Sequence, residues 1–236
     1  MMKRLFYCIP LILTLTLFSC AQPYNSVEPS AAENETLVEL AHQNGDSLLV
    51  ITDSGLCTLE RGNLPRDLHS GAKLKVTCDG VLETYPGQFA NASAELVYDG
   101  DGLLDLYYSA FSDLMNTDSA LNDDISEIAL DFSSSSLTDG QKEALGYILS
   151  NLYGTGMSYS LSTYKDLESK GIIKNNTYEH GLLLTLKSEV SGDALSYSYG
   201  KYRSGTGATG IDNCKAEKKD GIWQNLQSDE TSAWIS

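Results

Sequence analysis

The chain is poor in basic residues, in histidine and in proline. It has 16 Lys and Arg against 32 Asp and Glu, and the resulting formal charge of -16 has the wrong sign for holding nucleic acid through its phosphates. Three His leave little material for histidine-rich metal sites or for several imidazole-based catalytic centres. A hydrophobic content of 42% with only 5 Pro excludes disordered and collagen-like chains. We therefore expect a globular protein with no nucleic-acid partner, no cofactor and no metal site.

A short apolar run near the amino terminus indicates export. Lys3 and Arg4 precede the run 5–18, and polar residues follow it. A helix that spans a membrane needs about 20 predominantly apolar residues, and this run is shorter. The layout is typical of a secretory signal peptide rather than of a membrane helix.

The apolar run ends at Leu17-Phe18-Ser19-Cys20, which resembles the lipobox of bacterial lipoproteins. The resemblance implies cleavage before Cys20 and attachment of diacylglycerol to its thiol, so that two acyl chains anchor the protein stably. We expect residues 1–19 to be a lipoprotein signal peptide and residues 20–36, rich in Pro, Ser, Ala and Glu, to be a lipid-anchored tether. The predicted location is the extracytoplasmic face of the cell membrane, with the membrane as a partner through the lipid.

Three cysteines remain after Cys20, and no Cys-x-x-Cys spacing indicates a redox motif or a zinc ribbon. A disulfide between Cys57 and Cys78 is one reading for an exported protein. The other reading is that Cys78, in phase with Leu74 and Val76, is a small core residue.

Residues 37–100 have the pattern of a small β domain. Two short apolar runs flank Asp53-Ser54-Gly55, and the alternating run 73–78 precedes the hairpin signal Asp79-Gly80. So many strand edges in so short a segment are protected by curling. We predict a small, closed or half-open barrel of OB-like type.

Residues 101–236 have mixed helical and strand patterns. Leu103 to Leu114 carry one apolar helical face that Asp101 can cap, and Thr138 and Thr163 open capping-box patterns completed by Gln141 and Asp166. Strand patterns follow at 182–190, 195–201 and 209–216, then a hairpin at Asp220-Gly221. The predicted fold class is therefore α+β: the small β-barrel, then an α+β domain with a mainly antiparallel sheet.

Two segments resemble known families. Residues 71–88 contain Asp79-Gly80, then Glu83-Thr84-Tyr85-Pro86, then Gln88, and this segment resembles uncharacterised β-barrel-like lipoproteins of low-GC Gram-positive bacteria over about residues 46 to 98. The run Lys201-Tyr202-Arg203-Ser204-Gly205-Thr206-Gly207-Ala208, with 212–216 and 221–223, is similar to the end of an uncharacterised α+β domain from exported proteins of the same bacteria. The resemblances imply an architecture and a location, and neither implies a catalytic residue.

Gly205-x-Gly207-x-x-Gly210 has the spacing of a dinucleotide-binding loop. That loop must end a strand and open a helix within a βαβ unit. The residues that follow, 211–220, are polar and end in a turn signal, so we expect a loop or a β-bulge here.

No Lys or Arg occurs between Lys75 and Lys142, and within this acidic stretch residues 99–105 begin like a calcium loop. Leu104 stands where that loop needs Gly, and Ala110 stands where it needs Glu. We expect a turn between domains and a helix cap, with calcium binding as the alternative.

The sequence has no G-x-S-x-G nucleophile elbow. A nucleophilic site formed by Cys214, or by a Ser, with His180 is conceivable because sequence does not exclude that they lie close in space, although neither Cys214 nor His180 has a local signature. His69 and His180 are more simply turn residues. We therefore expect no catalytic residues.

Tyr199, Tyr202 and Arg203 lie near the glycine-rich loop and are the candidate binding residues, because Tyr and Arg anchor interfaces well. Strand packing is the alternative for the tyrosines, and a fork onto a carboxylate of the acidic first half is the alternative for Arg203. The predicted function is a non-catalytic binding or interaction module whose partner is an unknown envelope protein or ligand. An unrecognised cell-envelope hydrolase is the alternative.

Overall fold

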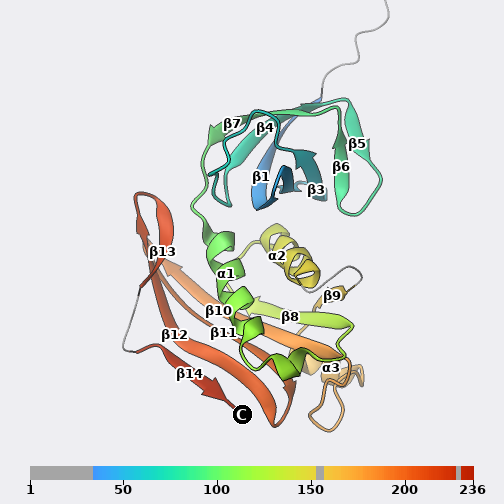
Figure 1. Ribbon diagram of the computed structural model, residues 1–236, viewed down its shortest axis with the longest axis vertical. Helices are drawn as coiled ribbons and strands as arrows, with labels where there is room; N and C mark the ends of the chain where they lie inside the picture. The colour runs from blue at the N-terminus through green and yellow to red at the C-terminus, as the bar shows by residue number, and fades with distance from the viewer. Residues whose placement is uncertain (1–33, 153–156, 227–229) are drawn as a thin grey trace, which may run out of the picture. The chain divides into compact units, whose positions relative to one another are not determined.

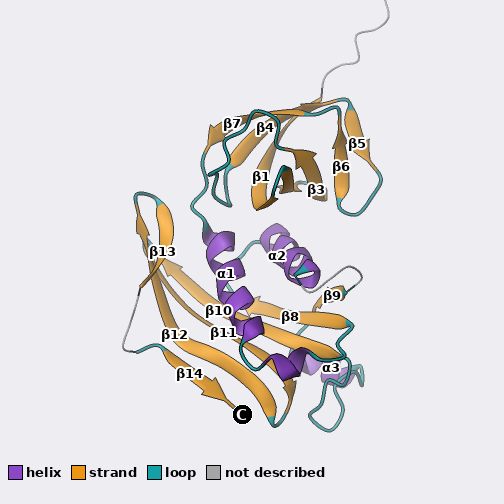
Figure 2. Ribbon diagram, viewed as in Figure 1, coloured by secondary structure: helices purple, strands orange, loops and turns teal. Residues whose placement is uncertain are grey.

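The computed structural model describes residues 34–152, 157–226 and 230–236. The predicted signal peptide, Cys20 and most of the predicted tether lie outside these residues. The described residues belong to one compact unit, Glu33–Ser236. Its described part is rich in β-structure, with two seven-stranded sheets and few helices (Figures 1 and 2).

The first sheet uses the strands of residues 34–98. They are β1 (Asn34–Asn44), β2 (Ser47–Thr52), β3 (Gly55–Glu60), β4 (Lys73–Cys78), β5 (Gly80–Leu82), β6 (Gly87–Ala90) and β7 (Ser93–Tyr98). Their order across the sheet is β5-β6-β3-β2-β1-β4-β7. Neighbouring strands are antiparallel except β3 and β6, which are parallel over two residue pairs. The first strand begins at Asn34, inside the segment predicted as tether.

Two details of the sequence prediction are wrong for this sheet. The order across the sheet starts at β5 and ends at β7, so the described strands form an open sheet and no closed barrel. The predicted hairpin at Asp79-Gly80 does not form either, because β5 pairs with β6. Strand β4 is hydrogen-bonded to β1 on one edge and to β7 on the other. It therefore has no free edge for β5, which pairs with β6 instead.

The first sheet buries an apolar cluster on one face. Strand β4 alternates between half-buried and buried positions, as the period of a strand with one covered face requires. Cys57 and Cys78 both lie in this cluster, and burial raises the pKa of the Cys57 thiol. Cys57 is a free thiol, so the disulfide reading is wrong, and the reading of Cys78 as a small core residue is confirmed.

The second sheet follows residue 126. Its strands are β8 (Glu127–Ser134), β9 (Ser158–Leu161), β10 (Gly181–Ser191), β11 (Ala194–Ser204), β12 (Gly207–Lys219), β13 (Ile222–Leu226) and β14 (Ser232–Ile235). The order is β13-β12-β11-β10-β8-β9, with β14 also paired to β12. The pairs of β8 with β9 and with β10 are parallel, and the pairs that β10, β11, β12, β13 and β14 make among themselves are antiparallel.

The helices are α1 (Leu103–Asn116), the 3-10 turn η1 (Ser119–Asn122), α2 (Asp139–Asn151) and α3 (Tyr164–Ser169). The capping boxes predicted at Thr138 and Thr163 are confirmed, since both threonine side chains accept from the backbone three residues ahead. Helix α1 starts differently. Gly102 is its N-cap, while the Asp101 carboxylate accepts from the N–H of Leu103 at 3.2 Å.

Helices α1 and α2 contact both sheets (Figure 1). Ala41, Leu49 and Leu56 of the first sheet belong to the same buried cluster as the apolar faces of α1, α2 and the second sheet. This cluster therefore links the two sheets, while the first sheet keeps a separate core of its own on its other face. No helix in the described part of the chain is long and apolar enough to span a membrane.

Candidate binding cleft

A cavity of about 610 Å³ lies between the first sheet and the helices α1 and α2. This volume falls within the range of about 300–1,000 Å³ that is usual for small-ligand sites. The cavity is lined by six polar residues, two tyrosines and three apolar residues: His42, Gln43, Asn44, Ser47, Thr58, Asn151, Tyr108, Tyr147, Leu49, Ile148 and Leu152. We call this cavity the cleft.

The pairing of β1, β2 and β3 explains why these side chains meet. His42 pairs with Leu49, and Leu49 pairs with Thr58, so these three lie in one row across the sheet. Asn44 and Ser47 pair two positions further along the same strands and so lie on the same face. The register of β1 shifts between Leu40 and His42, and such bulges re-aim side chains at functional sites.

His42 forms part of the cleft wall. Its ring centroid lies 4.8 Å from that of Tyr108 on α1. Burial lowers the pKa of His42, and the negative charge of Asp105 opposes this effect. The cleft therefore presents a neutral imidazole near neutral pH, with one donor and one acceptor nitrogen.

Gln43 carries the one orphaned polar atom of the cleft lining. Its Nε2 donates to the carbonyl oxygen of Leu68, and its Oε1 is buried without a hydrogen-bond partner among the described residues. Buried polar atoms are normally satisfied by protein or by another molecule. Gln43 pairs with Leu48 of the first sheet's own core, so its side chain lies on the opposite face of β1 from His42, and the orphaned atom belongs to that core side.

A group of tyrosines borders the cleft beside α2. The hydroxyls of Tyr85 and Tyr159 both donate to Glu143 Oε1, at 2.8 and 2.6 Å. The Tyr85 ring meets the Tyr147 ring edge to face, with centroids 6.0 Å apart. Burial and the carboxylate of Glu143 raise the pKa of Tyr159. These contacts hold the loop that follows β5 against the helix carrying Tyr147.

A second cavity of about 800 Å³ continues from the cleft along β3 and β6. Ser47 and Thr58 line both cavities. Asp46 and Glu60 stand in the lining of the second cavity, and Arg66 pairs with Asp46 at 3.0 Å. The two cavities together form a groove across β2 and β3.

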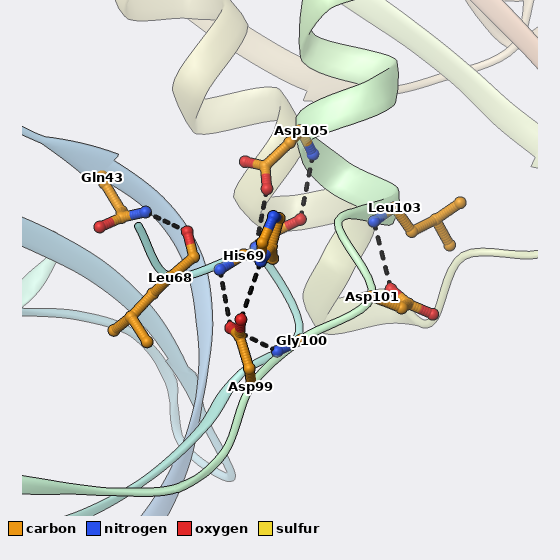
Figure 3. Close-up of polar contacts among 9 residues, drawn as sticks. Gln43, Leu68, His69, Asp99, Gly100, Asp101, Leu103 and Asp105 are labelled. Atoms are coloured by element: carbon orange, nitrogen blue, oxygen red, sulfur yellow. Dashed lines mark hydrogen bonds and ion pairs between the residues drawn. The ribbon is translucent and has the colours of Figure 1, made fainter. Parts of the chain in front are cut away.

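The segment 68–71 joins the cleft to the start of α1 (Figure 3). Asp99 accepts from the backbone and ring nitrogens of His69, both at 2.8 Å, and from the N–H of Gly100. Ser70 and Asp105 bond to each other through backbone and side chain. Through Leu68, this cluster fixes the position of the Gln43 amide.

The carboxylates within residues 99–105, the segment that begins like a calcium loop, each contact a different group of the protein. Asp99 binds His69, Asp101 binds Lys218 and the Trp223 indole, and Asp105 binds Ser70. No group of three or more His, Cys, Asp or Glu side chains is placed to hold a metal ion in the described ranges. The acidic start of the second half thus forms a turn and a helix start.

In the structure, each of the three predicted binding residues contacts other residues of the protein. Tyr199 is buried with its ring centroid 5.7 Å from that of Phe111, and burial raises the pKa of Tyr199 to about 12. The Tyr202 hydroxyl donates to the carbonyl of Asn176 at 2.6 Å. Arg203 donates to backbone carbonyls, including that of Glu179 at 3.0 Å, so the carboxylate partner expected for it is wrong. A binding role for the three stays a prediction.

The remaining sequence candidates also lie elsewhere. Cys214 is buried, and burial raises the pKa of its thiol to about 11. Neither Cys214 nor His180 lines the cleft. The glycine run 205–210 turns from β11 into β12 with no helix after it, as expected, and a side chain at Gly210 would meet the ring of Trp234. The cleft residues escaped sequence reasoning because they come from three strands and two helices, and only the polar run His42-Gln43-Asn44 hinted at them.

Comparison with known proteins adds little to this picture. No family model and no curated protein matches the chain. Among solved structures, the Ifi202 HINa domain in complex with 20-bp double-stranded DNA matches at 8% identity and a TM-score of 0.24, covering 86% of this chain and 95% of that one. The p202 HIN1 domain with a 12-mer double-stranded DNA matches at 7% identity and a TM-score of 0.21, covering 92% of this chain and 100% of that one.

The expectation of no nucleic-acid partner is corrected by these matches, since both structures contain double-stranded DNA. The net charge of the chain alone does not exclude a nucleic-acid partner. TM-scores this low carry no argument about what this chain binds, so its function is argued from the cleft.

Proposed function

We propose that the protein is an extracytoplasmic lipoprotein, held at the outer face of the membrane through lipid on Cys20, that binds a ligand in the cleft without transforming it. The observation that carries the proposal is the cleft lining. Neutral polar side chains and tyrosines surround a cavity large enough for a small molecule.

The lining favours binding over hydrolysis. His42 is the one titratable base among the lining residues, and no described hydrogen bond joins its ring to Ser47 or Thr58. A serine or threonine nucleophile needs a base within hydrogen-bond reach, and the base needs an orienting group. Cys214, the other candidate nucleophile, is a buried thiol with a raised pKa, which is the opposite of a reactive cysteine.

The anchor part of the proposal rests on Lys3 and Arg4, the apolar run after them and the lipobox-like residues that end at Cys20. It also accords with the family resemblance of residues 71–88. Its test is mass spectrometry of the membrane fraction from the native host, comparing the natural chain with Cys20→Ala. We expect a diacylglyceryl amino-terminal peptide in the natural chain and release of the variant; an unmodified, freely secreted natural chain would remove the anchor from the proposal.

The binding part is tested by thermal unfolding of the secreted Cys20→Ala chain with panels of amino acids, dipeptides, sugars and nucleosides. A ligand that binds only the folded state raises Tm by mass action. Ser47→Trp should abolish the rise, because Ser47 lines the cleft. Ser54→Trp, at the far end of the same hairpin, is the matched control. A bound compound recovered as a cleaved product would favour the hydrolase instead.

A further inference from the structure

We propose that the ligand of the cleft is an uncharged oligosaccharide that extends along the groove into the second cavity. This inference rests on the proposed function and names its ligand class. It is argued from the charge, the hydrogen-bonding groups and the strand pairing of the lining.

The cleft lining is uncharged although the chain is strongly acidic. None of the eleven lining residues is Asp, Glu, Lys or Arg. A charged ligand would leave water without meeting an opposite charge, which costs far more free energy than burying a hydroxyl that finds a partner. The cleft therefore selects an uncharged ligand.

The polar groups of the lining both donate and accept. Amides of Asn44 and Asn151 and hydroxyls of Ser47 and Thr58 line the cavity. Each sugar hydroxyl also donates and accepts, so a ring carrying several of them matches such a lining.

Two half-buried tyrosines supply apolar ring surface beside these groups. Tyr108 comes from α1 and Tyr147 from α2, and both line the cleft. Contacts with His42 and with Tyr85 hold these rings in place. A sugar ring has apolar C–H faces as well as hydroxyls, and a fixed aromatic ring packs on such a face at little cost in entropy.

Strand pairing disfavours an extended peptide. Peptides that bind to sheets add a strand to a free edge. In the cleft, β1 is paired with β2 and β4, and β2 is paired with β1 and β3, so neither strand offers a free edge. Strand β3 is paired with β6 at Cys57 and Thr58, so its cleft residue Thr58 offers no free edge either. At these positions a peptide would have to bind through side-chain contacts alone.

The continuity of the two cavities argues for an oligomer. Ser47 and Thr58 line both, so a chain of sugar units can occupy the cleft and continue toward Phe89 and Asn91 in the second cavity. The carboxylate of Asp46 at that end is already paired with Arg66. Glu60 also lines that cavity, and a neutral chain meets no repulsion from either carboxylate, so affinity should rise with chain length.

The test is calorimetric titration of the secreted Cys20→Ala chain with cellotetraose and chitotetraose. Glucose and N-acetylglucosamine test the effect of length, tetragalacturonic acid tests charge, and N-acetyl-tetraalanine amide tests a neutral peptide. We expect at least one neutral tetrasaccharide to bind about tenfold or more tighter than its monomer. Its affinity should not change with salt, because screening acts on charges.

Cleft variants connect this binding to the site. Tyr147→Ala should weaken tetrasaccharide binding by about tenfold or more, whereas Tyr147→Phe, which keeps the ring, should stay within about threefold. Tyr98→Ala is the control, because Tyr98 is an exposed tyrosine on β7 that does not line the cleft. Unchanged Tm values show that the variants are folded.

The outcomes separate the two proposals. Binding of neither tetrasaccharide, or equal binding by Tyr147→Ala, overturns the oligosaccharide assignment. If the peptide or a nucleoside binds in the cleft while the sugars do not, this assignment falls and the binding function stands. If no compound of either experiment binds, both fall.

Discussion

Ser70 and Asp105 bond to each other twice across 35 positions of sequence. The Ser70 N–H donates to Asp105 Oδ2 at 2.8 Å, and the Asp105 N–H donates to the Ser70 hydroxyl at 3.0 Å. Asp105 lies in the first turn of α1, whose own N-cap, Gly102, supplies no side-chain bond. A residue outside the helix thus makes the reciprocal pair of a capping box and ties the segment 68–71 to α1 (Figure 3).

Ser70→Ala should therefore lower the free energy of unfolding by about 1–2 kcal/mol, as the loss of a helix cap does. Removing the buried Ser70 hydroxyl leaves the Asp105 N–H, in the first turn of α1, without its hydrogen-bond acceptor. Urea denaturation measures the change. Ser109→Ala, at an exposed position of the same helix, should change stability by less than about 0.5 kcal/mol, and an equal loss in both variants would contradict the capping role.

Gly100→Ala should destabilise the protein by about 3 kcal/mol or more, because an added methyl group has no room. A Cβ at position 100 would lie 2.0 Å from the carbonyl oxygen of Ser70 and 2.4 Å from the nitrogen of Ala72, both backbone atoms. Gly80→Ala is the matched control, since nothing lies within 4 Å of a Cβ there. Thermal and urea unfolding of the two variants compare them directly; similar stabilities would refute the close backbone approach.

Lys201→Met should lower stability by about 2 kcal/mol or more, because it leaves several buried oxygen atoms without a donor. The Lys201 side chain is 1% exposed, and its Nζ donates to the carbonyls of Met115 and Asp118 and to Asn122 Oδ1. These oxygens lie at the end of α1 and in the turn after it. The exposed Lys187→Met serves as control, and urea titration of both gives the difference.

The stability of the protein should fall as the pH drops below about 6.5, the usual pKa of histidine. Burial lowers the pKa of His42 in the folded state, so the unfolded chain takes up this proton first and gains from it. Asp105 opposes the shift but does not reverse it. The contribution is fully present above the unfolded pKa and is lost as the pH falls through the folded pKa.

His42→Gln should flatten this part of the stability curve. Chemical denaturation at several pH values between 7 and 5 measures the slope, and the exposed His180→Gln should keep it. A slope that survives in His42→Gln but disappears in another histidine variant would assign the effect elsewhere.

Local patterns predicted the helices of this chain well. The apolar stripe of α1 and the capping boxes at Thr138 and Thr163 depend on residues three or four positions apart, and the structure confirms them. Strand partners depend on distant residues, so the predicted pairing of β4 with β5 is wrong. The first strand was not predicted for a related reason. Strand β1 lies between β2 and β4, and no local signal in the sequence specifies both neighbours.

Predicting the cleft from the sequence would have required the same non-local information. Thr58 and Asn151 line one cavity from β3 and from α2, and no spacing within the sequence connects them. The tyrosines that sequence reasoning selected as binders are well placed for packing, as Tyr199 shows in the core. Abundance and proximity in sequence do not distinguish a tyrosine at the surface of a cleft from one in a core.

One wall of the cleft belongs to the first sheet, and the other belongs to helices that also pack on the second sheet. Strands β1, β2 and β3 form one wall, and α1 and α2, which also pack on the second sheet, form the other. Any molecule bound there cross-links the two halves of residues 33–236 without a covalent bond. Its binding free energy therefore adds to the cooperativity of unfolding, and an occupied cleft opposes separation of the two sheets more than an empty one does.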